Sequence, residues 1–557
     1  MTRPIDLLRQ GRKEELWQMC CGFLDLSLDQ FMTIQERLLR EQLGLLKNCE
    51  LGRRVMRGAM PETVEDFRQQ VPLTTYRDYL PDLVEQREDV LPAGVAYWVR
   101  TSGKTGEYEI KLVPVSERFA DECEKVCGGF TLLALCNERG DVSQVKEHLK
   151  VLYTMGGREY GSGFFGYLGQ LAIGYDFLPS DADGLSFQDS IRAGFKEALY
   201  TGLDAFGGLP SVLVAVGEQF RQKREKTSIR PLLSHPRALL RLTGGMARSK
   251  LARRPLLPRD LWSIKGIVGG GSDTAVFSRR VEELWGRRPL EIYGGTEGGI
   301  YAMQTWDHEG MTFVPNLDFF EFVPEREWFK WQLDHSYQPK TVLLDEVKAE
   351  ENYEVVITNF HGGALVRFRI GDLVRITSLR NEKLGIDIPQ MAFHSRADDL
   401  VDIFGVGHIT EKLVWQAIEN TGIPYVDWVA RKEAVEDKPT VHIYIELKGG
   451  YISSEQAVAA AVYDRLLELD KEHNFNLYKY AYGDAVELLG LKPINVTFLA
   501  EGAFASYITQ RQAEGADLGH LKPPHINPSD KVLSLLRVPP VEVEAVPAGR
   551  AAERALR

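Results

Sequence analysis

The segment Tyr293-Gly294-Gly295-Thr296-Glu297-Gly298-Gly299 carries four glycines within six residues, together with one hydroxyl and one carboxylate. It follows residues 289–292, a short run typical of a buried strand. We therefore expect a tight loop at a strand end, where the sheet of an α/β protein binds its ligand. There Thr296 could donate a hydroxyl to a phosphate and Glu297 could offer a hard oxygen to Mg²⁺. On its own the pattern also fits a plain tight turn with a solvated glutamate.

A second strand with a glycine-rich end precedes this segment. Residues 262–268 are typical of a strand, residues 269–272 read Gly-Gly-Gly-Ser, and residues 275–284 are typical of a helix. This alternation predicts doubly wound α/β sheets, with the two glycine loops side by side as a purine and ribose pocket requires. The residues expected to contribute are Gly270, Gly271, Ser272, Tyr293, Gly294 and Gly295. Residues 189–220, further upstream, are expected to be largely helical.

A third segment suits a polyphosphate. It follows a short strand at 95–99 and mixes hydroxyls, glycines and a lysine, with Lys111 shortly after. Backbone N–H groups and hydroxyls donate to phosphate oxygens, and lysine adds charge. The Walker A spacing is absent, and a flexible surface turn is the alternative. The expected phosphate-binding residues are Thr101, Ser102, Gly103, Lys104, Thr105 and Gly106.

Residues 155–167 form another glycine-rich segment, which we expect to be a loop. Its aromatic side chains could line a pocket for an apolar acid or stack on a base, although core packing explains them equally well. The candidates are Tyr160, Phe164, Phe165 and Tyr167.

The chain changes character after Tyr301. Residues 354–359 and 365–369 are expected to be strands of a smaller, barrel-like sheet. Residues 369–374 are expected to form a strand, a turn carrying Asp372, and a second strand. Aspartate is common in turns, and the functional alternative is a carboxylate bound to ribose hydroxyls.

A polar bend at residues 394–399 marks the expected domain boundary. We expect a large N-terminal domain at 1–395 and a smaller α+β domain at 396–537. Residues 538–557 are dominated by Pro and Ala and are expected to be a disordered tail.

Composition limits the possible partners. The formal net charge of −12 over 557 residues argues against non-specific nucleic-acid binding. The charged residues near the start of the sequence are not expected to be a signal peptide, and residues 161–175 are too short and too rich in glycine for a membrane helix. Residues 239–254 carry more basic side chains and are expected to cover a surface. The six cysteines have no metal-binding spacing and are expected to be reduced and mostly buried, as in a cytoplasmic protein.

The order of these motifs resembles the adenylate-forming (ANL) superfamily. TSGKTG is followed by the GGG loop, YGGTEGG, FRIGD, a polar hinge and a late lysine. Within that superfamily the chain resembles the auxin-responsive amido synthetase family, meaning the plant acyl-acid amido synthetases and their bacterial relatives. The resemblance covers residues 5–536 and is most family-specific at 499–504 and 520–524.

The resemblance implies roles for individual residues. Residues 101–106 would form the phosphate loop, although Lys104 stands where the family usually has a small hydroxyl residue. Tyr293, Gly294 and Thr296 would contact adenine and the α-phosphate, and Glu297 would hold Mg²⁺. Asp372 would bind the ribose, even though Phe368 replaces the tyrosine common in FRIGD. Arg396 and Asp398 would lie at the hinge of a mobile C-terminal domain, and Lys522 would reach the α-phosphate region during adenylation.

The implied activity is ATP- and Mg²⁺-dependent activation of a carboxylic acid, followed by transfer of the acyl group to an amino acid as an amide. No general base is needed in the first step, because a carboxylate is already ionised at neutral pH. An acyl-CoA ligase, acyl transfer to a carrier-protein thiol, and a non-catalytic acyl or nucleotide binder are the alternatives. A monomer without nucleic-acid or membrane partners is expected.

Overall fold

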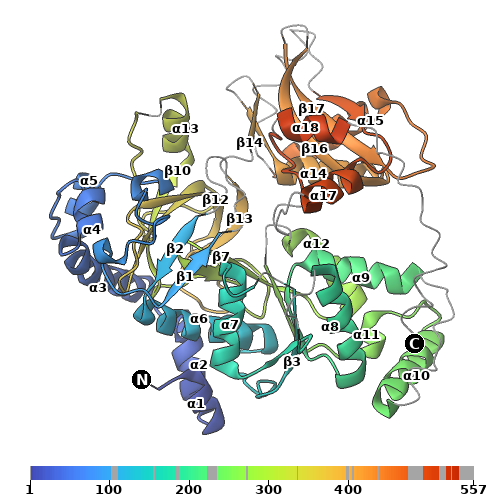
Figure 1. Ribbon diagram of the computed structural model, residues 1–557, viewed down its shortest axis with the longest axis horizontal. Helices are drawn as coiled ribbons and strands as arrows, with labels where there is room; N and C mark the ends of the chain where they lie inside the picture. Colours follow the sequence, from blue (N-terminus) through green and yellow to red (C-terminus); the bar gives the residue numbers. More distant parts are fainter. Residues whose placement is uncertain are drawn as a thin grey trace. The chain divides into compact units, whose positions relative to one another are not determined.

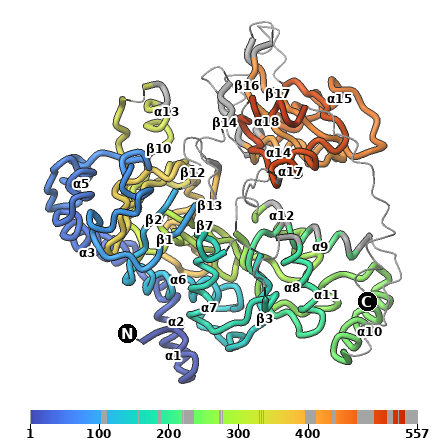
Figure 2. Tube along the Cα trace, viewed as in Figure 1, coloured from blue at the N-terminus to red at the C-terminus, as the bar shows by residue number. Residues whose placement is uncertain are grey.

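A computed structural model describes most of the chain (Figure 1; Figure 2). The described residues are 2–101, 111–154, 157–181, 187–222, 235–270, 274–334, 336–396, 400–403, 407–435, 438–473, 494–513, 522–528 and 530–537. The chain divides into two compact units, and between the long segments the division falls after His394. The division at 395/396 with a mobile second domain remains a proposal, and the tail at 538–557 lies outside the described residues.

The chain begins with short helices that pack on the first unit. They are α1 (Pro4–Arg9), α2 (Lys13–Cys21), η1 (Gly22–Asp25), α3 (Leu28–Lys47), α4 (Glu50–Val55), α5 (Val64–Gln70), η2 (Tyr76–Tyr79) and η3 (Glu88–Val90). Ser27 and Gln30 start α3 with a reciprocal capping box. Farther along α3, the buried amide of Gln35 donates to the carbonyls of Pro315 and Asp318, each at 2.7 Å. This satisfied polar group fixes α3 against the segment that begins β10.

All the described strands of the first unit except β1 and β2 form an 11-stranded sheet. Its order is β10 (Asp318–Pro324), β11 (Asn352–Asn359), β12 (Phe368–Ser378), β13 (Gln390–Arg396), β9 (Met311–Phe313), β8 (Gly299–Met303), β7 (Leu290–Gly295), β6 (Gly266–Gly269), β5 (Ala205–Gly208), β3 (Lys150–Thr154) and β4 (Asp176–Leu178). From β4 to β7 neighbouring strands are parallel. The pairs β7–β8, β8–β9, β9–β13, β11–β12 and β10–β11 are antiparallel.

Helices cover both faces of the parallel part, as the predicted doubly wound fold requires. Val151 of β3 belongs to the core that contains α6 (Glu117–Leu135) and α7 (Gly161–Ile173). Its neighbour Leu152 points the other way, into a second core. The helices of that core are α8 (Phe187–Thr201), α9 (Pro210–Gln222), α10 (Pro236–Leu251), α11 (Pro258–Leu261) and α12 (Thr274–Trp285). Residues 189–220 are largely helical as expected, in α8 and α9, but the short strand β5 lies between these helices and pairs with β3 and β6.

The antiparallel strands belong to the same sheet rather than to a separate one. β7 pairs with β6 on one side and with β8 on the other, so the sheet continues across it. The barrel-like arrangement expected for these strands is therefore wrong, and they close no barrel within the described residues. The hairpin of β1 (Tyr97–Arg100) and β2 (Leu112–Val115) and the helix α13 (Glu325–Leu333) complete the described elements of this unit.

The second unit is α+β. Its strands are β14 (Leu400–Ile403), β15 (Gly407–Thr410), β16 (Tyr425–Val435), β17 (Lys438–Leu447) and β18 (Ile494–Phe498), and its helices are α14 (Glu411–Thr421), α15 (Glu455–His473), α17 (Ala503–Ala513) and α18 (Asp530–Arg537). In the three-stranded sheet β16–β17–β18, the first pair is antiparallel and the second parallel. α14 and α15 pack on one hydrophobic core and α17 and α18 on another.

All six cysteines are buried, and none forms a disulfide. None of the helices in the described part of the chain is long and apolar enough to cross a membrane.

Candidate functional site

The glycine-rich segment at residues 293–299 forms a hairpin at the middle of the large sheet. Tyr293, Gly294 and Gly295 are the last residues of β7, and Gly299 begins β8 opposite Gly295. The expected irregular loop is therefore limited to the turn at 296–298. Glycine lets the hairpin close: Gly299 has φ +85°, and a Cβ on Gly298 would lie 2.6 Å from the Tyr301 ring and 2.7 Å from Asp318 Oδ2.

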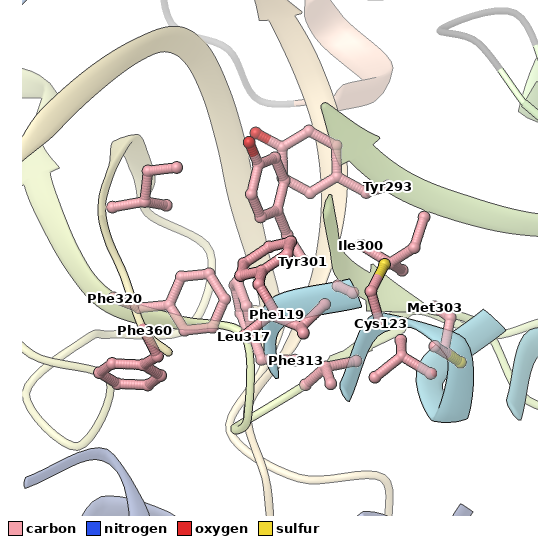
Figure 3. Close-up of a cluster of buried hydrophobic side chains, with 14 of the residues drawn as sticks. Phe119, Cys123, Tyr293, Ile300, Tyr301, Met303, Phe313, Leu317, Phe320 and Phe360 are labelled. Carbon is pink, nitrogen blue, oxygen red and sulfur yellow. The ribbon is translucent and has the colours of Figure 1, made fainter. Parts of the chain in front are cut away.

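Two buried polar side chains, those of Asn359 and Asp318, hold this turn in place. The Asn359 side-chain amide donates to the backbone carbonyl of Glu297 at 2.9 Å and to Asp318 Oδ1 at 2.8 Å. Burial raises the pKa of Asp318 well above its ordinary value, against the opposing effect of the hydrogen bond from Asn359. These contacts hold the turn through the backbone of Glu297 and do not involve its side chain. An apolar cluster below it includes Phe119, Cys123 and Leu317, all within 4 Å of the Cβ position of Gly299 (Figure 3).

Tyr293 and Asp372 meet across the sheet. The Tyr293 hydroxyl donates to Asp372 Oδ2 at 3.0 Å, and both residues are buried. The expected turn at Asp372 is wrong, because residues 368–378 form the single strand β12. An irregularity opposite Glu354 and Val356 contains Gly371 at φ +79°, so the chain bulges there instead of turning. The Tyr293 ring also lies 5.1 Å from that of Tyr301, its neighbour in Figure 3.

Lys111 approaches Glu297. Its Nζ lies 3.5 Å from Glu297 Oε1, and each side chain is only about one-eighth exposed, at 12% and 13%. The ammonium also lies 5.8 Å from the ring centroids of both Tyr76 and Phe368, a distance at which aromatic faces attract a cation. Lys111 N donates to Thr101 Oγ1 at 3.2 Å, which ties this lysine to the first residue of the expected phosphate loop. Residues 102–106 of that loop lie outside the described residues.

The third glycine-rich segment reaches the same turn. A Cβ on Gly161 would lie 2.2 Å from Thr296 Oγ1, so the first turn of α7 packs directly on that threonine. The expectation of a loop over 155–167 is wrong from Gly161 onward, because α7 begins there. Glycine disfavours helices, but here it permits close packing: a Cβ on Gly166 would lie 2.4 Å from the Tyr153 ring.

The aromatic candidates in and beside α7 have different environments. Phe164 is buried in the core, with its ring 5.1 Å from that of Tyr97. Phe165 and Tyr167 are partly exposed, and the Arg158 guanidinium lies 4.1 Å from the Tyr167 ring centroid. Tyr160 is partly exposed, and its backbone forms an isolated parallel β-bridge with Arg100 at the end of β1.

Gly270 lies at the carboxyl edge of the parallel strands. Its N–H donates to the Gly208 carbonyl at 3.0 Å, directly after β5 and β6 end. A Cβ on Gly208 would lie 2.1 Å from Thr154 Oγ1, a buried hydroxyl with no hydrogen-bond partner among the described residues. Because glycines line this edge of the sheet, a ligand could approach the backbone closely there. Gly271 and Ser272 lie outside the described residues.

Lys522 belongs to the second unit, where a buried network contacts it. Its Nζ is 3.6 Å from Asp427 Oδ2, and its side chain is 66% exposed. Asp427 Oδ1 also binds His525 Nε2 at 2.8 Å, and His525 Nδ1 contacts Glu411. Burial disfavours the charged imidazole, but the hydrogen bonds to Asp427 and Glu411 outweigh it and raise the pKa of His525 to about 9. Arg396 ends β13, and Asp398 lies outside the described residues.

Two supporting residues escaped the sequence analysis. Tyr76 exchanges hydrogen bonds with Leu112 through its hydroxyl, beside Lys111, and Asn359 holds the backbone of Glu297. Neither belongs to a glycine-rich motif, and both reach the site only through long-range packing.

The donor set fits one Mg²⁺ ion shared with a substrate. No group of three or more His, Cys, Asp or Glu side chains that could hold a metal occurs in the described ranges. Mg²⁺ in nucleotide enzymes is commonly bound by one or two carboxylates together with substrate phosphates. Glu297, whose side chain lies beside Lys111 and whose backbone carbonyl is fixed by Asn359, suits that role.

The fold is that of the adenylate-forming ligases. The chain is similar to 2-hydroxyisobutyryl-CoA ligase in the postadenylation state in complex with R3-HIB-AMP, with a TM-score of 0.58, 14% identity and 91% of each chain covered. It is similar to AtGH3.15 acyl acid amido synthetase in complex with 2,4-DB, with a TM-score of 0.62, 17% identity, and 94% of this chain and 96% of that chain covered.

Two family models give a finer assignment. Residues 21–167 match the GH3 family N-terminal domain, and residues 311–396 match the GH3 family central domain. The chain therefore carries domains of the GH3 family, and the family resemblance read from its motifs is confirmed.

Curated relatives are similar over part of their length. Jasmonoyl-L-amino acid synthetase JAR4 of Nicotiana attenuata is 32% identical over 199 residues, which are 33% of this chain and 32% of that protein. Jasmonoyl-L-amino acid synthetase GH3.5 of Oryza sativa subsp. japonica is 26% identical over 293 residues, 49% of this chain and 47% of that protein. The matched regions thus span about a third and about half of the length of these relatives.

Proposed function

We propose that the protein is an ATP-dependent ligase that activates a carboxylic acid as an acyl-adenylate and joins it to the amine of an amino acid. The products are an amide, AMP and pyrophosphate. The observation that carries the proposal is the hairpin at 293–299, where the Tyr293–Asp372 and Glu297–Lys111 pairs flank Thr296. The GH3 domains, and relatives named as amino acid synthetases, supply the class of reaction.

In the first step, a substrate carboxylate oxygen attacks the α-phosphorus of ATP and pyrophosphate leaves. The protein must bring the two anions together and offset the charge that develops on the phosphate oxygens. We assign this to Thr296, whose hydroxyl lies close against Gly161 at the start of α7, and to Lys111, which approaches the same turn. Mg²⁺ bound through Glu297 would neutralise phosphate charge when present.

Asp372 is assigned to the ribose hydroxyls. The Tyr293 hydroxyl donates to one of its oxygens and fixes the orientation of the carboxylate. We assign nucleotide binding to Gly294 and Gly295, together with Gly270, Gly271 and Ser272. We assign the phosphates of the nucleotide to residues 101–106. Lys104 is included because its charge suits a phosphate.

Lys522 is assigned to the adenylation step. Its ammonium is exposed, and its contact with Asp427 anchors the segment that carries it. Arg396 and Asp398 are assigned to a hinge about which the C-terminal domain moves between the two half-reactions. Tyr160, Phe164, Phe165 and Tyr167 remain candidates for the acyl pocket, with Phe165 and Tyr167 favoured by their partial exposure. We further propose that the enzyme acts in the cytoplasm as a monomer.

The second candidate is an acyl-CoA ligase, because the fold is shared with 2-hydroxyisobutyryl-CoA ligase. Both reactions pass through the same first step and differ in the acceptor. Mass spectrometry of reactions with Mg-ATP, a panel of aromatic and aliphatic acids, and either amino acids or CoA separates them. We expect an amide and AMP with amino acids. A thioester with CoA and no amide would assign the chain to the CoA ligases, and neither product would reject the proposal.

A further inference from the structure

The outer face of α10 exposes an aliphatic stripe. Leu240 is 71% exposed and Leu251 88% exposed. Gly244 and Ala247 lie between them at helical spacing, so the four residues share one face of the helix. Single exposed leucines are ordinary on protein surfaces, but here two strongly exposed leucines lie on the same face of one helix, and only a glycine and an alanine separate them along that face.

The opposite face of α10 fixes the direction of this stripe. Ala238, Gly245 and Ser249 are buried, and a Cβ on Gly245 would lie 2.7 Å from Leu261 of α11. Arg241 donates to the carbonyls of Leu199 and Tyr200 near the end of α8, at 2.8 and 3.0 Å. Contacts on both sides of this face hold the helix, so the stripe cannot turn inward without breaking them.

Basic side chains border the stripe on both sides. Residues 235–259 contain no Asp or Glu, in a chain whose formal net charge is −12. The basic residues of that segment are Arg237, Arg241, Arg248, Lys250, Arg253, Arg254 and Arg259. Arg241 binds α8 and Arg254 binds Asp260, whereas Arg237, Lys250 and Arg253 are exposed. On a helical projection Arg237 and Lys250 fall on opposite sides of the Leu240–Leu251 stripe.

We propose that this face of α10 docks peripherally on an anionic lipid bilayer surface. An amphipathic helix with an apolar stripe and basic flanks binds such a surface through apolar burial and attraction to acidic headgroups. The absence of a membrane partner was expected because no segment could span a bilayer, and surface docking requires no span. The proposal is independent of the ligase activity.

Two other partners fit this face less well. A second copy of the chain, paired through the same face, would set basic side chains against basic side chains. A nucleic acid would use the cations, but α10 carries no aromatic side chain for base stacking, and the exposed leucines would gain nothing from phosphates. Of these three partners, a lipid surface alone uses both the charge and the leucines.

The test is co-sedimentation of the full-length protein with vesicles of phosphatidylcholine alone or mixed with phosphatidylserine. We expect binding only to the mixed vesicles, with loss of binding in high salt as screening shortens the range of the attraction. Leu251→Glu should weaken binding by about tenfold, because a leucine that enters the interface loses its apolar burial. Lys250→Gln and Arg237→Gln should each weaken it by roughly fivefold.

Matched variants separate this surface from general effects. Leu379→Glu introduces the same change at a half-exposed leucine near the end of β12, and Lys383→Gln removes an exposed lysine there. Both should bind vesicles like the wild type, and all variants should keep the wild-type thermal midpoint. Equal binding to both vesicle types, equal losses in Leu251→Glu and Leu379→Glu, or α10-dependent binding of RNA without vesicle binding would each overturn the proposal.

Discussion

Two neighbouring tyrosines at the hairpin should respond in opposite ways to loss of their hydroxyls. The Tyr293 hydroxyl donates to Asp372 at 3.0 Å in a buried environment. Hydrogen bonds to charged groups contribute about 1.5–3 kcal/mol, so Tyr293→Phe should lower the free energy of unfolding by about 2 kcal/mol. The Tyr301 hydroxyl is buried without a hydrogen-bond partner among the described residues. Because an unsatisfied buried hydroxyl costs about 1–3 kcal/mol, Tyr301→Phe should be neutral or stabilising by about 1 kcal/mol.

The assay is urea unfolding of the nucleotide-free protein, combined with hydrogen exchange in β7 and β8. The two substitutions remove the same atom from rings whose centroids are 5.1 Å apart, so each serves as the control for the other. We expect a difference of about 2–3 kcal/mol between the variants, and faster exchange in the hairpin of Tyr293→Phe alone. Equal effects, or a larger loss in Tyr301→Phe, would show that the Tyr293–Asp372 bond does not hold the hairpin.

Three further substitutions test other parts of the account. Gly161→Ala places a Cβ 2.2 Å from Thr296 Oγ1, so it should lower the free energy of unfolding by about 1–3 kcal/mol and reduce adenylation. Its control is Gly44→Ala, on an open face of α3, which should raise the free energy of unfolding by about 0.5–1 kcal/mol. Thermal unfolding and pyrophosphate release compare the two variants. His525 has its pKa raised to about 9 from an ordinary 6.5, so its pairing should stabilise the fold fully below pH 6.5 and lose up to about 3 kcal/mol as pH rises through 9. His525→Gln should flatten that pH profile in urea unfolding, while His148→Gln, at an exposed histidine, should leave it unchanged. Lys111→Gln should lower the adenylation rate about a hundredfold, and Lys383→Gln, at an exposed lysine, should not; wild-type rates in Lys111→Gln would remove Lys111 from the site.

The sequence predicted what depends on local pattern and chain order. The α/β alternation gave the doubly wound sheet, and the order of motifs gave the family. The resemblance implied that Tyr293 and Asp372 both contact the nucleotide, but the hydrogen bond between them was not predicted, because they lie far apart in the chain.

Local sequence pattern gave wrong predictions at glycines, because glycine occurs in turns, in closely packed helices and in β-bulges alike. The glycines at 161–166 favour a loop by local pattern, but they lie in α7 and allow that helix to pack closely against Thr296 and Tyr153. Gly371 was read as part of a turn, yet its positive φ serves a bulge within β12. In both places tertiary packing decided the conformation, and a single sequence does not display that packing.

Strand pairing was the other source of error. The residues of β5 lie within a segment of helical character, and only their pairing with β3 and β6 makes them a strand. Likewise, the strands after Tyr301 looked like a separate small sheet, because nothing local indicates that β8 pairs with β7. Tertiary packing also brings Lys111 to Glu297, a contact that the sequence did not predict, although it placed Lys111 beside the phosphate loop and Glu297 on Mg²⁺.

The most direct test of the central claim is acid-dependent exchange of labelled pyrophosphate into ATP, with Mg²⁺ present and without any amine or thiol. Exchange under these conditions requires a reversibly formed acyl-adenylate. We expect the wild type to exchange label only when a suitable carboxylic acid is added. Glu297→Gln should lose the exchange by at least about a hundredfold, and Glu309→Gln, at an exposed glutamate, should retain it. Wild-type exchange in Glu297→Gln, or no exchange with any acid by a protein that binds ATP, would contradict the account.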